Sequence, residues 1–236
     1  MKLLHLSDLH LGRSMGDFDL KEDQEYILDR ILDTISEQSV DAVLIAGDVY
    51  DKFVPSEAAT RMLDSFLRRL AALKVKTFMI SGNHDSDDRL NFGSSLFTGS
   101  GIFISAVFDG KLHKQTITDG KIEADVYMLP FVKASQVRRF FPEAKIDTYE
   151  DAVRTVLESA EPDPGKVNIL IAHQFVSGRG GDPALGGSES VGTQTVGLVE
   201  KIGYKCFDGF DYVALGHIHS PQSSSGEISP YSRSSL

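Results

Sequence analysis

Short apolar segments alternate with amphipathic helical patterns in the first third of this chain of 236 residues. Residues 2–7, 41–47 and 76–81 predict strands, and the segments around Leu28 and Leu63 repeat apolar residues at the spacing of one helical face, with Ser56 as an expected cap of the second helix. Strands that are apolar throughout are typical of a parallel sheet with helices on its faces. The pattern therefore predicts an α/β fold with catalytic residues at the strand ends.

The second half of the chain predicts a different arrangement. Short strand-like pieces between residues 102 and 128 are broken by Asp109-Gly110 and Asp119-Gly120, which favour hairpin turns. A helix near residues 149–160 and strands over 167–172 and 212–215 follow. The glycine-rich residues 178–197 contain no GK[ST] sequence, so we interpret them as a connector and not as a nucleotide-binding loop.

Charge and cysteine content limit the classes of function. The net charge of −10 argues against a protein that holds nucleic acid by bulk electrostatics, although bound metal ions can attract phosphate locally. Cys206 is the only cysteine, which excludes an internal disulfide or a thiolate metal cluster and fits a reducing compartment. No apolar run is long enough for a membrane span or a signal peptide, so we expect a cytoplasmic protein that does not bind membranes.

Side chains able to bind metal follow five of the predicted strands. They are carboxylates, an amide and imidazoles, and comprise Asp8, His10, Asp48, Asp51, Asn83, His84, His173, His217 and His219. Residues i and i+2 that leave a strand point the same way, so Asp8 with His10 and His217 with His219 form pairs that can grip a metal. This mixture of ligands suits manganese, iron or zinc, with manganese as our first choice. Asp48 is the expected bridge between two ions roughly 3.5–4 Å apart.

Each of these motifs has an ordinary structural interpretation when it occurs alone, as a turn, cap or loop. Five of them in order, each directly after an apolar strand, favour a metal centre. Other residues are expected to be structural. His5 in the first strand should be a satisfied structural residue, His113 should be solvated, and Asp85 should bond nearby backbone amides and shape its turn.

The ordered motifs D-x-H, G-D-x-x-D, G-N-H-D, a single strand-end histidine and G-H-x-H resemble the signature of the calcineurin-like metallophosphoesterases over nearly the whole chain. Their flanks, such as HLSDLHLG, SGNHDS and FDYVALGHIHSPQ, closely resemble the SbcD-type exonuclease subunits of bacterial SbcCD complexes. The resemblance implies one domain over residues 1–236, a four-layer α/β/β/α sandwich of two mixed sheets flanked by helices. It also implies two manganese ions, exonuclease or endonuclease cleavage of DNA in double-strand-break repair, an SMC-type ATPase partner and a homodimer.

The same resemblance assigns roles to the site residues. One ion would be held by Asp8, His10, Asp48 and His219, and the other by Asp48, Asn83, His173 and His217. His84 is expected to contact the scissile phosphate and assist the leaving group, with Asp51 orienting or charging its ring. The expected nucleophile is a hydroxide activated by the two metals. Because histidine ligands must be neutral, metal affinity should weaken below about pH 6.

The chain also departs from the SbcD-type pattern. Those proteins continue past G-H-x-H into a capping and partner-binding region, which we expect to be absent here, and residues 231–236 have Arg233 and Ser235 where the family has glycine and proline. The homodimer rests on resemblance, because burial explains the apolar helices near Leu28 and Leu63 equally well. The alternative function is a small-molecule metallophosphatase or cyclic nucleotide phosphodiesterase of the same superfamily. The complete set of ligands disfavours a binding scaffold.

Overall fold

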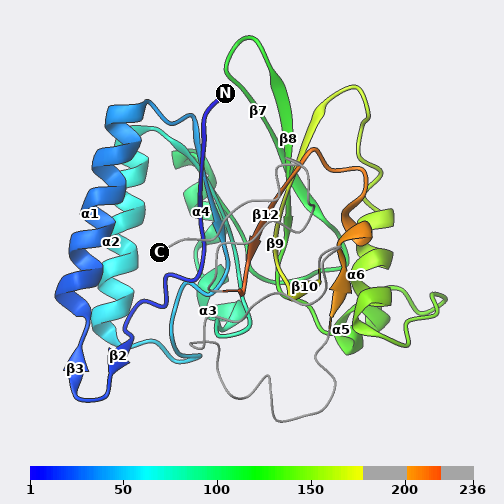
Figure 1. The fold of residues 1–236 in the computed structure, drawn as a ribbon, viewed down its shortest axis with the longest axis horizontal. Helices are drawn as coiled ribbons and strands as arrows, with labels where there is room; N and C mark the ends of the chain where they lie inside the picture. The colour runs from blue at the N-terminus through cyan, green and yellow to red at the C-terminus, as the bar shows by residue number, and fades with distance from the viewer. Residues whose placement is uncertain (178–200, 219–236) are drawn as a thin grey trace.

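The computed structural model describes residues 1–177 and 201–218. Two four-stranded sheets form the centre of the molecule, and helices lie on either side of them (Figure 1). The elements are β1 (Leu3–Leu6), β2 (Ser14–Met15), β3 (Phe18–Asp19), α1 (Lys21–Gln38), β4 (Ala42–Ala46), α2 (Glu57–Leu73), β5 (Lys76–Ile80), α3 (Asp87–Asn91), α4 (Ser94–Phe97), η1 (Thr98–Ser100), β6 (Ile102–Ser105), β7 (His113–Thr118), β8 (Glu123–Leu129), α5 (Ala134–Phe140), α6 (Tyr149–Glu158), β9 (Val167–His173), β10 (Val176–Ser177), β11 (Ile202–Gly203), η3 (Tyr204–Phe207) and β12 (Tyr212–Gly216).

The two sheets differ in the direction of their strands. The first sheet has the order β1-β4-β5-β6, and all three of its strand pairs are parallel. The second has the order β12-β9-β8-β7, in which β7 runs antiparallel to β8 and the other pairs are parallel. The parallel strands of each sheet therefore end at a common edge.

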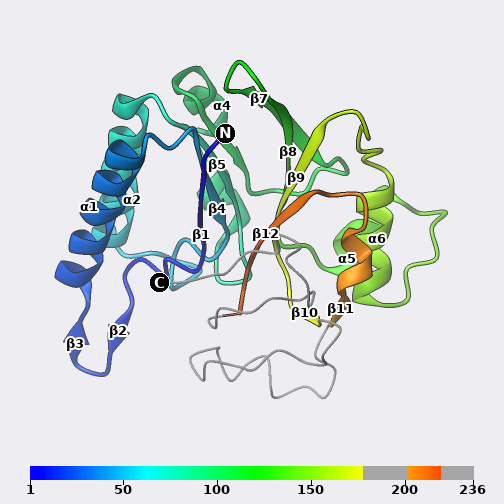
Figure 2. The same ribbon diagram turned by 45° about the horizontal axis from the view of Figure 1, so that its top comes forward.

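Three hydrophobic clusters hold these elements together. One fills the space between helices α1 and α2 and the first sheet, a second lies between the two sheets, and a third lies between the second sheet and helices α5 and α6. Figure 2 shows the order of these helices and sheets. Side chains alternate along each strand, so Val43 and Ile45 of β4 face the helices while Leu44 faces the other sheet. Because both faces are covered, all three side chains are fully buried. This is why the central strands read as continuous apolar runs.

Most of the predicted elements are confirmed. Strands occur at all five predicted apolar runs, and α1, α2 and α6 occur at the predicted helical patterns. The Ser56 hydroxyl caps α2 by accepting a hydrogen bond of 3.2 Å from the Ala59 amide. Asp119-Gly120 forms the turn between β7 and β8, as expected. The predicted hairpin at Asp109-Gly110 is wrong, because the strands before and after it belong to different sheets.

The apolar faces of the two long helices are buried within the domain. Leu28 of α1 and Leu63 of α2 belong to the cluster against the first sheet. Burial against that sheet, one of the two explanations of these apolar patterns, therefore accounts for them. These faces are therefore not available to a second copy of the chain. Among the described residues, no helix is both long enough and apolar enough to cross a membrane.

Candidate metal centre

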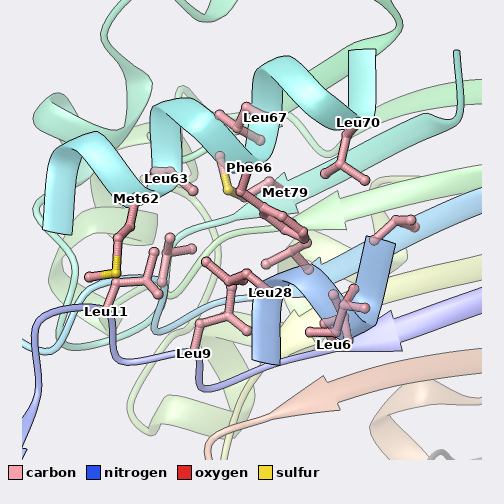
Figure 3. Close-up of a cluster of buried hydrophobic side chains, with 14 of the residues drawn as sticks. Leu6, Leu9, Leu11, Leu28, Met62, Leu63, Phe66, Leu67, Leu70 and Met79 are labelled. Atoms are coloured by element: carbon pink, nitrogen blue, oxygen red, sulfur yellow. The ribbon is translucent and has the colours of Figure 1, made fainter. Parts of the chain in front are cut away.

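The segment after β1 presents alternate side chains to the core and to the strand ends. Leu9 and Leu11 are buried against residues of α1 and α2, as Figure 3 shows. Asp8 and His10 alternate with them, and both lie among the polar residues that follow β4 and β5. The His10 amide donates to the Asp48 carbonyl at 3.0 Å, which ties this segment to the one after β4.

Asp48 lies at the centre of the polar cluster. The residue is 2 % exposed, and its Oδ2 lies 3.3 Å from Nε2 of His173, 3.8 Å from Nε2 of His10 and 4.0 Å from Nε2 of His84. Its Oδ1 accepts a hydrogen bond of 2.9 Å from the His84 amide. One carboxylate therefore faces ring nitrogens from three different segments, which is the geometry that a bridging metal ligand requires.

The Asn83 side chain contacts two histidines at the strand ends of the second sheet. Its Oδ1 lies 3.1 Å from Nε2 of His173 and 2.9 Å from Nδ1 of His217. The His217 amide also donates to both carboxylate oxygens of Asp8, at 3.1 and 3.2 Å. These contacts join the carboxyl ends of strands from the two sheets at one place.

Ser7 belongs to this group, although the sequence-based prediction missed it. Its hydroxyl donates to Oδ2 of Asp8 at 2.5 Å and so fixes the orientation of that carboxylate. The only signal in the sequence was its position directly before Asp8 at a strand end. Serine is too common there to indicate such a role.

Main-chain carbonyls set the orientation of two of the rings. Nδ1 of His173 donates to the Ala46 carbonyl at 2.7 Å, which leaves Nε2 directed at Asp48 and Asn83. Nδ1 of His84 lies 3.0 Å from the carbonyl oxygen of Asp51. The expected contact to His84 therefore comes from the backbone of Asp51, whereas its carboxylate lies 3.6 Å from Nδ1 of His10. The physical reason is that the chain turns after Tyr50 and directs the Asp51 carbonyl at the ring.

The backbone at the site is strained. Asp8, His10, Asp48 and His217 all have positive φ angles, of 54°, 42°, 48° and 87°. Residues with side chains rarely adopt this conformation, and it persists only where surrounding contacts enforce it. Four predicted ligands share it, so the strand-end turns direct their side chains at a considerable conformational cost.

Glycines allow the segments to approach this closely. A Cβ atom at Gly82 would lie 2.1 Å from Oδ1 of Asp48, and one at Gly47 would lie 2.5 Å from the ring of His173. At Gly216 it would lie 2.1 Å from the Ala46 carbonyl oxygen. Any side chain at these positions would occupy the space of a predicted ligand or of its backbone support.

Asp85 holds the turn that carries Asn83 and His84. Its buried carboxylate accepts hydrogen bonds from the amides of Gly82, Val49 and Tyr50 at 2.8, 3.1 and 2.9 Å. The prediction that it bonds nearby backbone amides is confirmed. Burial raises the pKa of Asp85 to about 6, opposed by these amides and reinforced by the nearby charge of Asp48.

The arrangement contains two overlapping groups of residues that could hold metal ions. His10, Asp48 and His84 form one group, and Asp8, Asp48 and His173 form the other, with ligand atoms within 4.8 Å of one another in each. Imidazole and carboxylate ligands that share a buried carboxylate fit two divalent ions. His84, predicted to contact phosphate, lies within the first group, and His219 lies outside the described residues.

Burial and charge shift the proton affinities at this site. Burial by itself disfavours both charged forms, but the mutual attraction of Asp48 and His173 outweighs it. The pKa of Asp48 is held well below its usual range, and that of His173 is raised to about 9. The loss of metal affinity expected below about pH 6 therefore begins at a higher pH for His173.

The two histidines expected to be structural differ from each other. Burial lowers the pKa of His5 to about 4, so its ring is neutral, and it packs edge-on against Tyr212 with ring centroids 6.5 Å apart. The charge of Asp8 and a contact with the Leu215 backbone oppose this shift, although neither ring nitrogen makes a hydrogen bond of normal geometry among the described residues. His113 is exposed and pairs with Asp109 at 3.0 Å, consistent with a solvated position.

The fold and this cluster define a class of α/β protein that carries a candidate metal centre at the carboxyl ends of its strands. The family model for calcineurin-like phosphoesterases matches residues 1–221, and the chain belongs to this family. Membership implies a metal-dependent hydrolase that acts on phosphoesters. The match includes every predicted metal ligand.

We predict that Gly82→Ala prevents normal metal binding. The added methyl group would overlap the Asp48 carboxylate and its backbone nitrogen, at 2.1 and 2.3 Å, so the bridging ligand must move. Elemental analysis should find fewer metal ions per chain than in the wild type. Gly99→Ala is the matched control, because no atom lies within 4 Å of its added Cβ. If Gly82→Ala retained the wild-type metal content, the close approach would not matter to the site.

We also predict that metal binding releases a proton from His173 near neutral pH. Its pKa of about 9 in protein stripped of metal means that the ring is charged at pH 7.5, and a metal at Nε2 must displace that proton. Calorimetric titrations in buffers of different ionisation enthalpy should give about one proton released at pH 7.5 and none well above pH 9.

The raised pKa of His173 also determines how the stability of the folded protein changes with pH. In protein stripped of metal, the stabilisation from this pair should be complete between about pH 4, above which Asp48 is ionised, and pH 6.5, and it should be lost as the pH rises through about 9. Metal binding at pH 7.5 without proton release would contradict the assignment.

Proposed function

We propose that this protein is a manganese-dependent DNA exonuclease and endonuclease that hydrolyses phosphodiester bonds. The observation that carries the hydrolytic part is the position of Asp48 between two groups of potential metal ligands. Family membership supports the same chemistry. The DNA substrate rests on the SbcD-type sequences that flank the ligands, such as HLSDLHLG and SGNHDS.

The proposed ligands divide between the two sheets. Asp8, His10 and Asp48, with His219, would hold one ion, and Asp48, Asn83, His173 and His217 would hold the other. The chemistry that the ions would supply is a lowered pKa for the attacking water and neutralisation of charge on the phosphate. Asp48 and Asn83 keep the imidazole nitrogens directed at common points, and Ser7 fixes the carboxylate of Asp8.

His84 would act on the substrate. Its Nδ1 is held by the Asp51 carbonyl, and its Nε2 lies at the edge of the group around Asp48. A ring that donates to the carbonyl and also to a phosphate oxygen carries protons on both nitrogens. That form can give a proton to the leaving oxygen. The Asp51 carboxylate would act on His10 instead, because it lies near that ring.

The proposal includes partners and the remaining architecture. An SMC-type ATPase subunit, a cytoplasmic location and a role in repair of double-strand breaks rest on the resemblance. For the homodimer, Phe92 and Leu96 near α3 and α4 are exposed apolar residues, whereas Leu28 of α1 and Leu63 of α2 are buried. Three hydrophobic clusters lie between four successive layers, which are a pair of helices, the first sheet, the second sheet and a second pair of helices. This arrangement supports a four-layer sandwich for the single domain.

One observation favours the alternative substrate class. The net charge of −10 would repel the DNA backbone, whereas a small phosphoester needs only the local charge of the metal ions. The two functions share one metal centre and differ in what surrounds it. An experiment that distinguishes the two functions must therefore compare substrates, because the metal ligands are the same in both.

We predict manganese-dependent cleavage of labelled single-stranded and duplex DNA that is abolished by a chelator. The measurement compares DNA with the nitrophenyl phosphate monoester and diester under the same conditions. Cleavage of DNA together with the diester supports the nuclease. Turnover of the monoester without any DNA cleavage would establish the small-molecule alternative instead.

We predict that His84→Ala retains two metal ions but loses most of the cleavage activity, by about 10²–10⁴-fold as for loss of a general acid. Asp48→Ala should lose metal as well, because it removes the shared carboxylate. Elemental analysis and the cleavage assay together test this pair. A His84→Ala protein that binds fewer ions would show that His84 is a ligand, as its place beside His10 and Asp48 allows.

A further inference from the structure

Gln24, in the first turn of α1, binds the segment that carries His10. Its side-chain nitrogen Nε2 donates to the carbonyl oxygens of His10 and Leu9, at 2.8 and 3.3 Å. Its Oε1 accepts a hydrogen bond from the Gly12 amide at 2.9 Å. One half-buried amide group therefore holds three backbone groups within four consecutive residues.

These bonds act where the backbone is strained. His10 has a φ angle of 42° and Gly12 one of 88°, so the chain turns sharply on both sides of Leu11. Such a conformation persists only if neighbouring contacts enforce it. The His10 amide is fixed by the Asp48 carbonyl at 3.0 Å, and the His10 carbonyl is fixed by Gln24 and by the Arg13 amide. Gln24, together with the Arg13 amide, thus holds the carbonyl side of His10, whereas the contact with Asp48 holds its amide side.

The support behind Gln24 is rigid. Helix α1 has 18 residues, and Leu28, one turn after Gln24, is buried in the same cluster as Leu9 and Leu11 (Figure 3). The leucines attach the segment to the core by packing, and Gln24 fixes its rotation by hydrogen bonds. A ligand built on a rigid element with oriented supports binds metal more tightly than one on a free loop.

We propose that Gln24 is a positioning residue for the metal site, which holds the backbone of residues 9–12 so that His10 faces Asp48. This rests on the proposed two-metal function, because His10 is taken as a ligand of one ion. Gln24 itself would not be a ligand, because its amide group contacts the backbone of residues 9–12. Its loss should therefore weaken the binding of the ion on the His10 side. The affinity for the ion held by Asn83, His173 and His217 should be largely unchanged.

Two substitutions separate the contacts. Gln24→Leu removes all three hydrogen bonds, whereas Gln24→Glu keeps an acceptor for the Gly12 amide and sets a carboxylate against two carbonyl oxygens. Gln38→Leu and Gln38→Glu are matched controls, because Gln38 is an exposed residue of the same type at the other end of α1. All four variants are titrated with Mn²⁺ in the full chain without substrate, by calorimetry and by electron paramagnetic resonance.

We expect both Gln24 variants to bind one of the two Mn²⁺ ions about 10–100-fold more weakly and the other nearly as the wild type does. The resonance signal of a coupled pair should become that of a single ion at limiting Mn²⁺, and excess Mn²⁺ should restore it. The Gln38 variants should match the wild type. Equal affinity of Gln24→Leu and wild type for both ions, or equal weakening of both ions, would overturn the proposal.

Hydrogen exchange provides a measurement that does not depend on metal. In protein stripped of metal, Gln24→Leu should accelerate exchange of the Gly12 amide, and Gln24→Glu should not, because it retains the acceptor. Unchanged exchange in Gln24→Leu would refute the role of Gln24 in holding the segment. A wild-type protein that binds no pair of Mn²⁺ ions would instead refute the proposed function, so the two failures can be told apart.

Discussion

The buried carboxylate of Asp48 is the feature on which the rest of the site depends. A charge that is 2 % exposed is costly unless opposite charge or hydrogen bonds compensate it. Here the compensation comes from the rings of His173 and His84 and from the His84 amide. The raised pKa of His173 is a direct consequence, because a proton on that ring neutralises the carboxylate in the absence of metal. Divalent ions would replace this proton. The need to neutralise the Asp48 carboxylate therefore favours a protonated His173 without metal and the bound ions when metal is present.

Bringing three rings to one carboxylate explains the unusual backbone around it. Gly47 and Gly82 have no side chain because the space is taken by His173 and by Asp48 itself. The left-handed conformations of Asp8, His10, Asp48 and His217 require external support. Asp85 supplies it for the turns after β4 and β5, through three backbone amides. The strain at the site therefore lies in the turns at the strand ends, while the strands themselves pack regularly.

The strand ends could be predicted from the sequence because strands buried on both faces are continuous apolar runs, and because metal-binding residues follow them directly. The short helices α3 and α4 gave no such signal, since five and four residues are too few for a full apolar period. Asp109-Gly110 has the composition of a hairpin turn, but packing between sheets decides where the next strand pairs. Contacts such as that of Gln24 with the His10 carbonyl, between residues 14 apart, depend on how a helix docks and leave no local pattern.

The position of the site between two sheets links metal binding to the assembly of the fold. Asp8, Asp48 and Asn83 follow strands of the first sheet, whereas His173 and His217 belong to the ends of β9 and β12 in the second. The sheets otherwise meet through apolar side chains such as Leu44 and Phe78, which resist separation but have little directional preference. Ions shared between ligands of both sheets would add that direction, and they would stabilise the folded state because the unfolded chain cannot present the same ligands together. The apolar interface thus brings the carboxyl ends of the strands of both sheets together, and the polar cluster fixes the position of one sheet relative to the other.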